Sequence, residues 1–587
     1  MRSLISLVMI VTAAGAWAAG PSRADRAFEK VALDYLKEYP ALSPVGATEL
    51  GDHRFDAELD DVSAATRARI VDLCHRYLAR LAKTPREKLS RPNQVDAALL
   101  EHRLRAMLWQ TEELQEWAWN PVRYTGLAGG ALYSLLARDY APLPQRLACA
   151  ASRLEQLPRL LAQVRATLDP KRVPKVNAET AVQQNRGVLS ILEEMVTPRL
   201  GELAPELRNR LEKAMATSRT AVEEHQRWLE NELLPAAKGD FRIGDKAFDR
   251  KLAFTLNTPL TRMDVGHRAL AEFERVRREM YEVAKQVYLK QYPLTTFPAK
   301  PDEDYRQAIT RAALEVAYRE LPPADAIVDT AKALLAEAET FVKSHDLVTV
   351  PPDPVEIIVM PEHERGIALA YCDSPGPLDR GQKTFYAVAP LPATWTKEQV
   401  QSFLREYNLY SLRDLTMHEA MPGHFLQIAL SNRYPSTLRA VLSSGPFVEG
   451  WAVYAEKFMV DAGYLDGNPL QRLIQLKWYL RAVTNAIIDQ AIHCDGMTEA
   501  DAMKLMIEGA FQEEREAAGK WRRASLTSTQ LSTYFVGYQE HADLLEEVRA
   551  AWGSDFSLKR YNDTLLSFGS PPVRFVRALM LNQPIPR

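Results

Sequence analysis

The sequence has few cysteines, and their arrangement predicts neither a thiolate metal site nor a disulfide framework. Four cysteines are spread over 587 residues, at positions 74, 149, 372 and 494. No two of them form a C-x-x-C pair, which excludes the common cysteine-based zinc motifs. Four cysteines allow three pairings, and this spacing favours none of them. We therefore predict buried free thiols.

A strong charge bias and long apolar segments are also missing. The formal net charge is −3, so no basic face is implied and nucleic acid is excluded as a partner class. After the first residues, no apolar run approaches the roughly 20 residues of a membrane span. No fixed-period repeat is present, which argues against a solenoid. With 25% charged and 47% hydrophobic residues, the composition is that of a globular protein.

The first eighteen residues have the three parts of a secretory signal peptide. Arg2 provides a positive charge, residues 4–14 form a short apolar segment, and residues 16–18 form an Ala-Trp-Ala cleavage site. No cysteine follows this site, so a lipid anchor is not predicted. We expect residues 1–18 to be removed, and the mature chain to be periplasmic or secreted without a membrane span.

Apolar residues recur at helical spacing over most of the chain. Phe28, Val31, Tyr35 and Leu36 illustrate the pattern near the N-terminus. A break in composition at residues 237–244 marks a soft boundary between an N-terminal helical region, 19–245, and a C-terminal region, 246–587. We expect the two regions to form one compact unit. Further helices are predicted over residues 71–81, 95–114, 150–168, 178–195, 203–234, 262–289, 304–321, 324–345 and 470–493.

Three short runs of alternating apolar residues predict strands within this helical chain. They span residues 355–359, 367–371 and 384–388. We predict a small antiparallel sheet immediately before the stretch that carries the chemistry. An exposed edge of such a sheet could hold an extended peptide by strand addition, or the sheet could simply cover the core.

The stretch LTMHEAMPGHFLQ, residues 415–427, has the groups of a catalytic zinc site. In the usual H-E-x-x-H motif, two histidines one helical turn apart bind zinc and the glutamate is the general base. Here His418 and His424 are six residues apart, which separates them by about 120° on a straight helix. Pro422 and Gly423 precede the second histidine, so we predict a break that brings His424 back towards His418 and Glu419.

A second motif, FVEGWAVYAE at residues 447–456, offers a third metal ligand. Glu449 and Glu456 are seven residues apart and share a helix face. Either could complete a His2Glu site, while the other holds a ligand histidine by its second ring nitrogen. We place Glu449 on the metal because it lies at a helix start. The alternatives are a kinked helix with two unrelated histidines, and two solvated surface glutamates.

These two motifs resemble those of the DUF885 family of bacterial proteins. The resemblance extends over most of the chain: residues 43–54 resemble the family's opening segment, and Gln530 and Tyr534 match its P-G-Q-A-x-x-Y pattern, with Ser528 and Thr529 in place of Pro-Gly. It implies a mainly α, multi-helical zincin-like fold that encloses a cleft, with the small sheet beside the site, and it makes residues 246–587 a C-terminal zincin-like catalytic region. The family is regarded as metallopeptidases distantly similar to the gluzincins.

The predicted helix over residues 470–493 carries a polar stripe. Arg481, Asn485, Asp489 and His493 follow one another at steps of four, so they line one face. The stripe alone indicates a solvated face, but the family keeps an Asp and a His in this region, which favours a wall of the site. Asp489 would then orient a ligand or His493, and His493 or Tyr534 would stabilise an oxyanion.

Together these observations predict an exported zinc-dependent hydrolase that acts on short peptides. His418, His424 and Glu449 would hold Zn2+, and Glu419 would activate water. Arg523 would bind a substrate carboxylate, with Gln530 beside it. Two alternatives stay open, since fold and metal do not fix the substrate. One is a hydrolase of another amide or ester; the other is a non-catalytic, zinc-stabilised envelope binding protein. The oligomeric state is not predicted.

Overall fold

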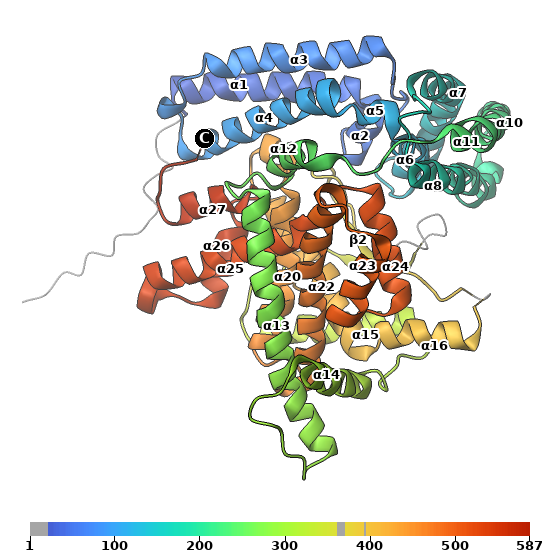
Figure 1. Ribbon diagram of the computed structural model, residues 1–587. Coiled ribbons are helices and arrows are strands. Elements are labelled where there is room, and N and C mark those ends of the chain that lie inside the picture. Colours follow the sequence, from blue (N-terminus) through green and yellow to red (C-terminus); the bar gives the residue numbers. More distant parts are fainter. Residues whose placement is uncertain (1–20, 361–369, 393–394, 587) are drawn as a thin grey trace, which may run out of the picture.

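The computed structural model describes residues 21–360, 370–392 and 395–586 (Figure 1). The predicted signal peptide and residues 367–369 of the second predicted strand lie outside these ranges. The prediction of a mainly helical protein is confirmed. The helices of the first region are α1 (Arg23–Glu38), α2 (Pro44–Glu49), α3 (Ala64–Ala82), α4 (Arg91–Trp109), α5 (Glu116–Trp119), α6 (Val122–Leu136), α7 (Leu143–Thr167), α8 (Lys175–Asn185), α9 (Gly187–Ile191), α10 (Pro205–Trp228) and α11 (Leu234–Ala236).

The second region holds the longest helices of the chain. Among the described residues, none of the helices is both long enough and apolar enough to cross a membrane. The helices of this region are α12 (Gly244–Leu256), α13 (Arg262–Gln291), α14 (Glu303–Ala317), α15 (Ile327–Ser344), α16 (Lys397–Glu406), α17 (Leu409–Glu419), α18 (His424–Ser431), α19 (Thr437–Val441), α20 (Gly445–Asp461), α21 (Tyr464–Gly467), α22 (Pro469–Cys494), α23 (Glu499–Lys504), α24 (Glu514–Leu526), α25 (Ser532–Trp552), α26 (Leu558–Leu566) and α27 (Val573–Met580).

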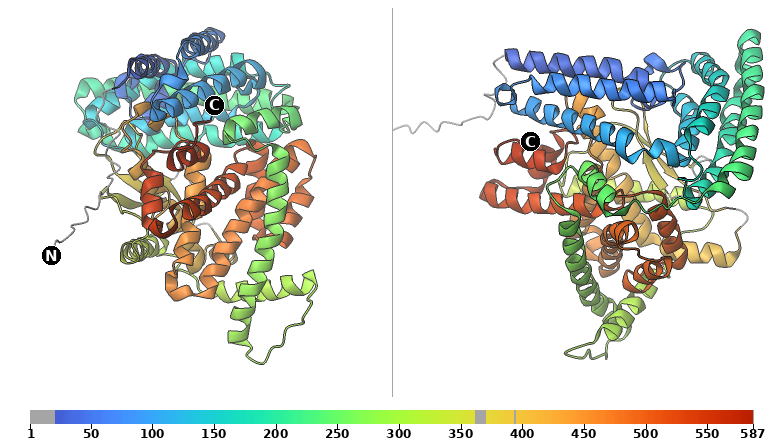
Figure 2. Two further views of the ribbon diagram at one scale, coloured as in Figure 1. Left: turned by 90° about the vertical axis from the view of Figure 1, so that its left-hand side faces the viewer. Right: turned by 45° about the horizontal axis from the view of Figure 1, so that its top comes forward.

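The first region forms a layer over the second. Figure 1 shows α1, α3 and α4 along the top and α7, α8 and α10 at the upper right, with α13, α20 and α22 below them, and the blue helices also lie along the top in both views of Figure 2. A buried ion pair joins the layers: Arg439 of α19, which is fully buried, donates from Nε to Asp96 of α4 over 2.6 Å. The same guanidinium donates to the carbonyls of Pro92 and Phe568. Because these partners satisfy a charge buried away from water, they hold the α19 segment against α4.

Helix α22 lies in the middle of the second region. It packs against α13 on one side and α25 on another, and α20 packs on α25 in turn. The apolar side chains of these helices belong to one large core that runs from Phe248 to Val576. The polar stripe of α22 is therefore not a solvated face, since Asn485, Asp489 and His493 are all buried.

The small sheet has three strands, β1 (Val355–Val359), β2 (Ala370–Asp373) and β3 (Thr384–Val388), in the order β1-β3-β2. Strand β2 pairs antiparallel with β3, but β1 pairs parallel with β3. The prediction of an antiparallel sheet is thus wrong for one of the two pairings. Alternation of apolar residues identifies a strand, but the chain reverses once before β2 and once after it, which leaves β1 and β3 pointing the same way.

Helices α20 and α25 touch through their backbones. A Cβ atom added to Gly450 would overlap the backbone of Gly537, and one added to Gly537 would overlap the carbonyl oxygen of Pro446. Two glycines thus let the helices approach more closely than any other residues would allow. Because Glu449 precedes Gly450 directly, this contact also fixes where Glu449 lies.

We predict that Gly450→Ala destabilises the protein. Alanine gains up to about 1 kcal/mol in helix propensity, but the added methyl group must push α20 and α25 apart, which typically costs about 1–3 kcal/mol or more. Gly519→Ala in α24 is the matched control, because nothing lies within 4 Å of its added Cβ. In urea unfolding, Gly450→Ala should unfold at lower urea than the parent, and Gly519→Ala at the same or higher urea. Equal midpoints for both variants would contradict the close contact.

Candidate metal centre

The two histidines lie on two separate helices because the chain breaks between them. Helix α17 ends at Glu419, Ala420 leaves helical geometry with φ −122° and ψ −78°, and α18 begins at His424. A Cβ atom at Gly423 would overlap the carbonyl oxygens of His418 and Met417, so only glycine fits there. The break that Pro422 and Gly423 predict is present. It brings the rings of His418 and His424 to a centroid distance of 4.7 Å, nearly perpendicular to each other.

Helix α20 is joined to this break by a tryptophan. The indole Nε1–H of Trp451, a fully buried residue, donates to the carbonyl oxygen of Pro422 over 2.9 Å. The helix begins after Ser444, whose hydroxyl accepts from the backbone N–H of Phe447. The EGW motif is thereby placed against the PGH motif, with Glu449 one turn inside the helix.

His418, His424 and Glu449 come together as one group. Oε2 of Glu449 lies 3.7 Å from Nε2 of His418 and 3.5 Å from Nε2 of His424. Within the described ranges, these three residues are the one group of His, Cys, Asp and Glu side chains close enough to hold an ion, with ligand atoms within 4.8 Å of one another. Tetrahedral zinc, with bonds of about 2.0–2.1 Å, requires ligand atoms roughly 3.3 Å apart.

The charges of this group also suit a cation. Oε2 of Glu449 is buried and accepts no hydrogen bond from the described residues. Burial raises the pKa of Glu449, but the two histidines more than offset this and hold it well below its usual range. Burial lowers the pKa of His418, whereas Glu449 and Glu456 raise it well above its usual range. The three side chains therefore fit a zinc ion in ligand type, spacing and charge.

Glu456 lies behind His418 rather than at the centre of the group. Its Oε1 is 2.6 Å from Nδ1 of His418, and its side chain is buried. This contact turns Nε2 of His418 towards Glu449 and leaves a ring tautomer suited to metal binding. Of the two glutamates that the sequence offers, Glu449 has the position of a ligand and Glu456 that of a support. Burial and the neighbouring Glu456 also raise the pKa of Asp414 well above its usual range.

Glu419 is held beside the group by the sheet. Its Oε2 accepts the backbone N–H of Cys372, in β2, over 3.0 Å. Glu419 and His418 line a cavity of about 140 Å³ that Tyr534 and Arg523 also line. Nη2 of Arg523 donates to the hydroxyl of Tyr534 and to Oε1 of Gln530, each over 2.9 Å. The structure thus brings the predicted base, tyrosine and arginine to one cavity.

Asp489 and His493 lie outside this cavity. The carboxylate of Asp489 accepts from the backbone N–H groups of Thr529 and Ser532 and from the hydroxyl of Ser532. It therefore fixes the turn before α25, the helix that carries Tyr534. Nε2 of His493 faces the carbonyls of Ala524 and Thr527, at 3.0 and 2.8 Å. The predicted role of His493 as an oxyanion donor does not fit, because this nitrogen already donates to the backbone.

Several lining residues were not singled out by the sequence. Trp478 and Lys520 line the cavity together with Arg481 and Asn485 of the polar stripe. Lys520 stands three residues before Arg523 on α24, a spacing that puts both on one helix face. This spacing is the signal in the sequence that could have identified Lys520 as a site residue, although it does not show which helix α24 packs against.

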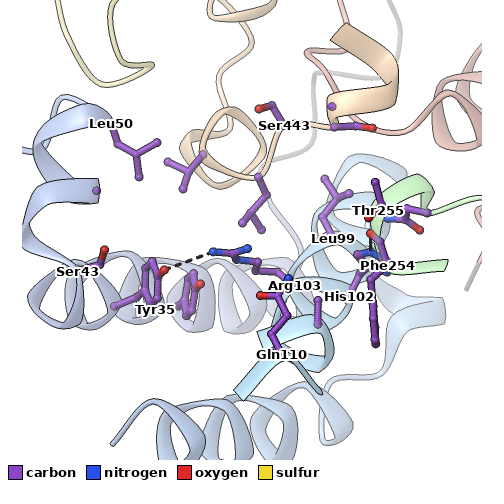
Figure 3. Close-up of a pocket in the computed structure, with 18 of the residues that line it drawn as sticks. Tyr35, Ser43, Leu50, Leu99, His102, Arg103, Gln110, Phe254, Thr255 and Ser443 are labelled. Carbon is purple, nitrogen blue, oxygen red and sulfur yellow. Dashed lines mark hydrogen bonds between the residues drawn. The ribbon is translucent and has the colours of Figure 1, made fainter. Parts of the chain in front are cut away.

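A larger cavity, of about 540 Å³, lies between the two layers and holds none of the three proposed ligands among its lining residues. Figure 3 shows Tyr35 and Arg103 from the first layer, Phe254 and Thr255 from α12, and Ser443 from the segment before α20. Residues 443–445 line it, and Glu449 follows one helical turn later. This cavity therefore borders α20, the helix that carries Glu449.

The fold and the site together define a class of protein: mainly helical, with a group of two histidines and one glutamate that could hold a metal ion. Comparison with known families shows that the chain belongs to DUF885, described as bacterial protein of unknown function, which matches residues 44–580. A solved "putative lipoprotein of unknown function" from Shewanella oneidensis is similar, with TM-score 0.80 and 31% identity over 94% of this chain and 99% of that one. A "putative lipoprotein" from Colwellia psychrerythraea has TM-score 0.74 and 17% identity, over 95% and 99%. No curated protein matches.

We predict that the two glutamates differ in their effect on zinc binding. Glu449→Gln removes the anionic oxygen that faces both histidines, so zinc affinity should fall by more than about 100-fold. Glu456→Gln removes a support of His418, for which losses of about 10–100-fold are usual. Zinc affinity is measured by competition with a chromogenic chelator. A greater loss for Glu456→Gln would show that the two glutamates are assigned the wrong way round.

Proposed function

We propose that this protein is an exported zinc-dependent peptidase that hydrolyses short peptides, with a zincin-like centre distantly similar to that of the gluzincins. The observation that carries the proposal is the position of Glu419. It lines the same cavity as His418, next to a group of two imidazoles and a carboxylate whose spacing fits zinc. A general base beside such a group is the arrangement that metal-assisted hydrolysis requires.

In this proposal each side chain has one task. His418, His424 and Glu449 would hold zinc, which as a Lewis acid polarises the scissile carbonyl and lowers the pKa of water to about 7. Glu419 takes the proton from the attacking water and passes it to the leaving amine. Because Cys372 N–H holds Oε2 of Glu419, the carboxylate keeps one orientation and Oε1 is left to accept the proton.

Tyr534 is the proposed donor to the oxyanion. Burial, and then the charge of Glu449, raise the pKa of Tyr534, so its phenol stays protonated at neutral pH. The hydroxyl accepts a hydrogen bond from Arg523, which leaves its own proton to donate. A donor held in a buried cavity stabilises developing charge without reorganising water.

Export is proposed on two grounds. The N-terminal sequence has the parts of a signal peptide, and the similar solved structure from Shewanella oneidensis is described as a "putative lipoprotein". Two further functions remain candidates on the same residues: hydrolysis of a different amide or ester, and zinc-stabilised binding without catalysis. The behaviour of Glu419 distinguishes catalysis from binding, because a binding protein has no use for a general base.

Glu419→Gln tests this proposal. Glutamine keeps the size of the side chain but cannot take a proton, so peptide hydrolysis should fall by about 10²–10⁴-fold. Zinc content and the urea midpoint should stay near those of the parent. Glu546→Gln is the control, because Glu546 is an exposed glutamate of α25 that pairs with Arg549. The measurements are rates on a peptide library and zinc content by elemental analysis.

Three results would overturn parts of the proposal. Loss of zinc from Glu419→Gln would make Glu419 a ligand. Full activity with zinc retained would move the hydrolytic centre elsewhere. A zinc-loaded parent that hydrolyses esters or other amides but no peptide would favour the second candidate, and one that hydrolyses nothing would favour the binding protein.

A further inference from the structure

Four hydrogen-bond donor side chains from two helices form part of the wall of the 140 Å³ cavity. Trp478 and Arg481 come from α22, and Lys520 and Arg523 come from α24. Each of these side chains carries N–H groups, and three of the four carry a positive charge in the protonated form. Four donor side chains around so small a cavity indicate a ligand that accepts hydrogen bonds.

Lys520 has no hydrogen-bonded partner among the described residues, and the charges of Glu516 and Glu449 act on its amine only from a longer range. The residue is only 5% exposed, and no hydrogen bond or ion pair joins it to the rest of the described chain. Burial, and then the charges of Arg481 and Arg523, hold the pKa of Lys520 well below its usual range. A side chain this buried is costly to charge, and an incoming anion would favour the charged form of the amine.

Two further donors on the wall are also unsatisfied. Nε1 of Trp478 and Nη1 of Arg481 are buried and have no acceptor among the described residues. The other end of the Arg481 guanidinium is paired with Glu516. Buried donors without acceptors are rare in folded proteins, and a bound ligand is one of the ordinary reasons for them.

Arg523 of α24 has no carboxylate among its hydrogen-bond partners in the described chain. Arg523 donates to Gln530 and Tyr534, which are both neutral groups. The carboxylates of Glu419 and Glu456 also line the cavity, where they are engaged with Cys372 and His418. The cavity is therefore lined by acidic groups next to His418 and by a basic group in which Arg481 is paired with Glu516, whereas Lys520 and Arg523 have no ion pair among the described residues.

We propose that Lys520 and Arg523 bind the C-terminal carboxylate of a peptide, so that the enzyme releases residues from the C-terminal end. This rests on the proposed peptidase function and names its substrate class. A guanidinium and a lysine amine suit a carboxylate, because charge-assisted hydrogen bonds are the strong ones. The cavity is smaller than the about 300–1,000 Å³ of usual ligand sites, which suits one terminal residue rather than a chain that passes through.

Three peptides distinguish the possible sources of the carboxylate. They are acetyl-Ala-Ala-Ala with a free C-terminus, the same peptide as its C-terminal amide, and acetyl-Ala-Ala-Asp-amide, which has only a side-chain carboxylate. The zinc-loaded protein should cleave the free acid with a kcat/KM about 10–100-fold above that of the amide, as the loss of a charged hydrogen bond predicts. Equal cleavage of acid and amide overturns the C-terminal specificity but leaves the peptidase. Preference for the aspartyl amide assigns the basic wall to an acidic side chain instead.

A binding measurement separates this inference from catalysis. By calorimetry, the zinc-free protein should bind acetyl-alanine more tightly than acetyl-alaninamide. Lys520→Met and Arg523→Lys should each reduce that preference by about tenfold or more. Arg522→Gln is the matched control, because Arg522 lies on the same helix but donates to Thr180 and Gln183 of α8; it should keep the preference.

The outcomes are read together with the urea midpoints of the variants, which should stay near the parent's. If Lys520→Met and Arg523→Lys are folded and keep the full preference for acid over amide, the basic wall is not the carboxylate site. If the zinc-loaded parent cleaves none of the three peptides, the peptidase proposal fails and the C-terminal specificity fails with it, whatever the calorimetry shows.

Discussion

The candidate centre depends on a backbone contact that only glycine permits. At Gly423 the chain passes so close to the carbonyls of Met417 and His418 that no side chain fits. This contact turns the chain after α17 and starts α18 with His424 beside His418. A second pair of glycines, Gly450 and Gly537, lets α20 approach α25, and so sets the position of Glu449. Two motifs thus become one site through close packing of backbone.

Buried charge is the second constraint on the centre. Glu449 faces two histidines, and Glu456 faces the far side of one of them, in a part of the core where unpaired charge is costly. A divalent cation held by His418, His424 and Glu449 would pair with Oε2 of Glu449, which accepts no hydrogen bond from the described residues. The basic side chains of the same cavity have the complementary imbalance, since neither Lys520 nor Arg523 has an ion pair among the described residues. The metal group and the basic side chains would then bind different parts of one substrate.

The sequence predicted the elements well and their partners less well. Helical spacing identified the main helices, and the Pro-Gly pair before His424 predicted the break, because both signals are local. The parallel pairing of β1 with β3 was missed, since alternation of apolar residues carries no information about strand neighbours. The role expected of His493 did not fit for the same reason: its partners are the carbonyls of Ala524 and Thr527, which lie more than thirty residues away. Lys520 was missed because only the packing of α24 shows what it faces.

Anomalous diffraction at the zinc absorption edge, from crystals of the purified protein grown with zinc, tests the central claim most directly. The account predicts one strong peak, about 2.0–2.2 Å from Nε2 of His418, Nε2 of His424 and a carboxylate oxygen of Glu449. Glu456 should remain on Nδ1 of His418, with Glu419 next to the ion and not bound to it. A peak coordinated by Glu419 or Glu456 in place of Glu449, or no peak between the two histidines, would contradict the account.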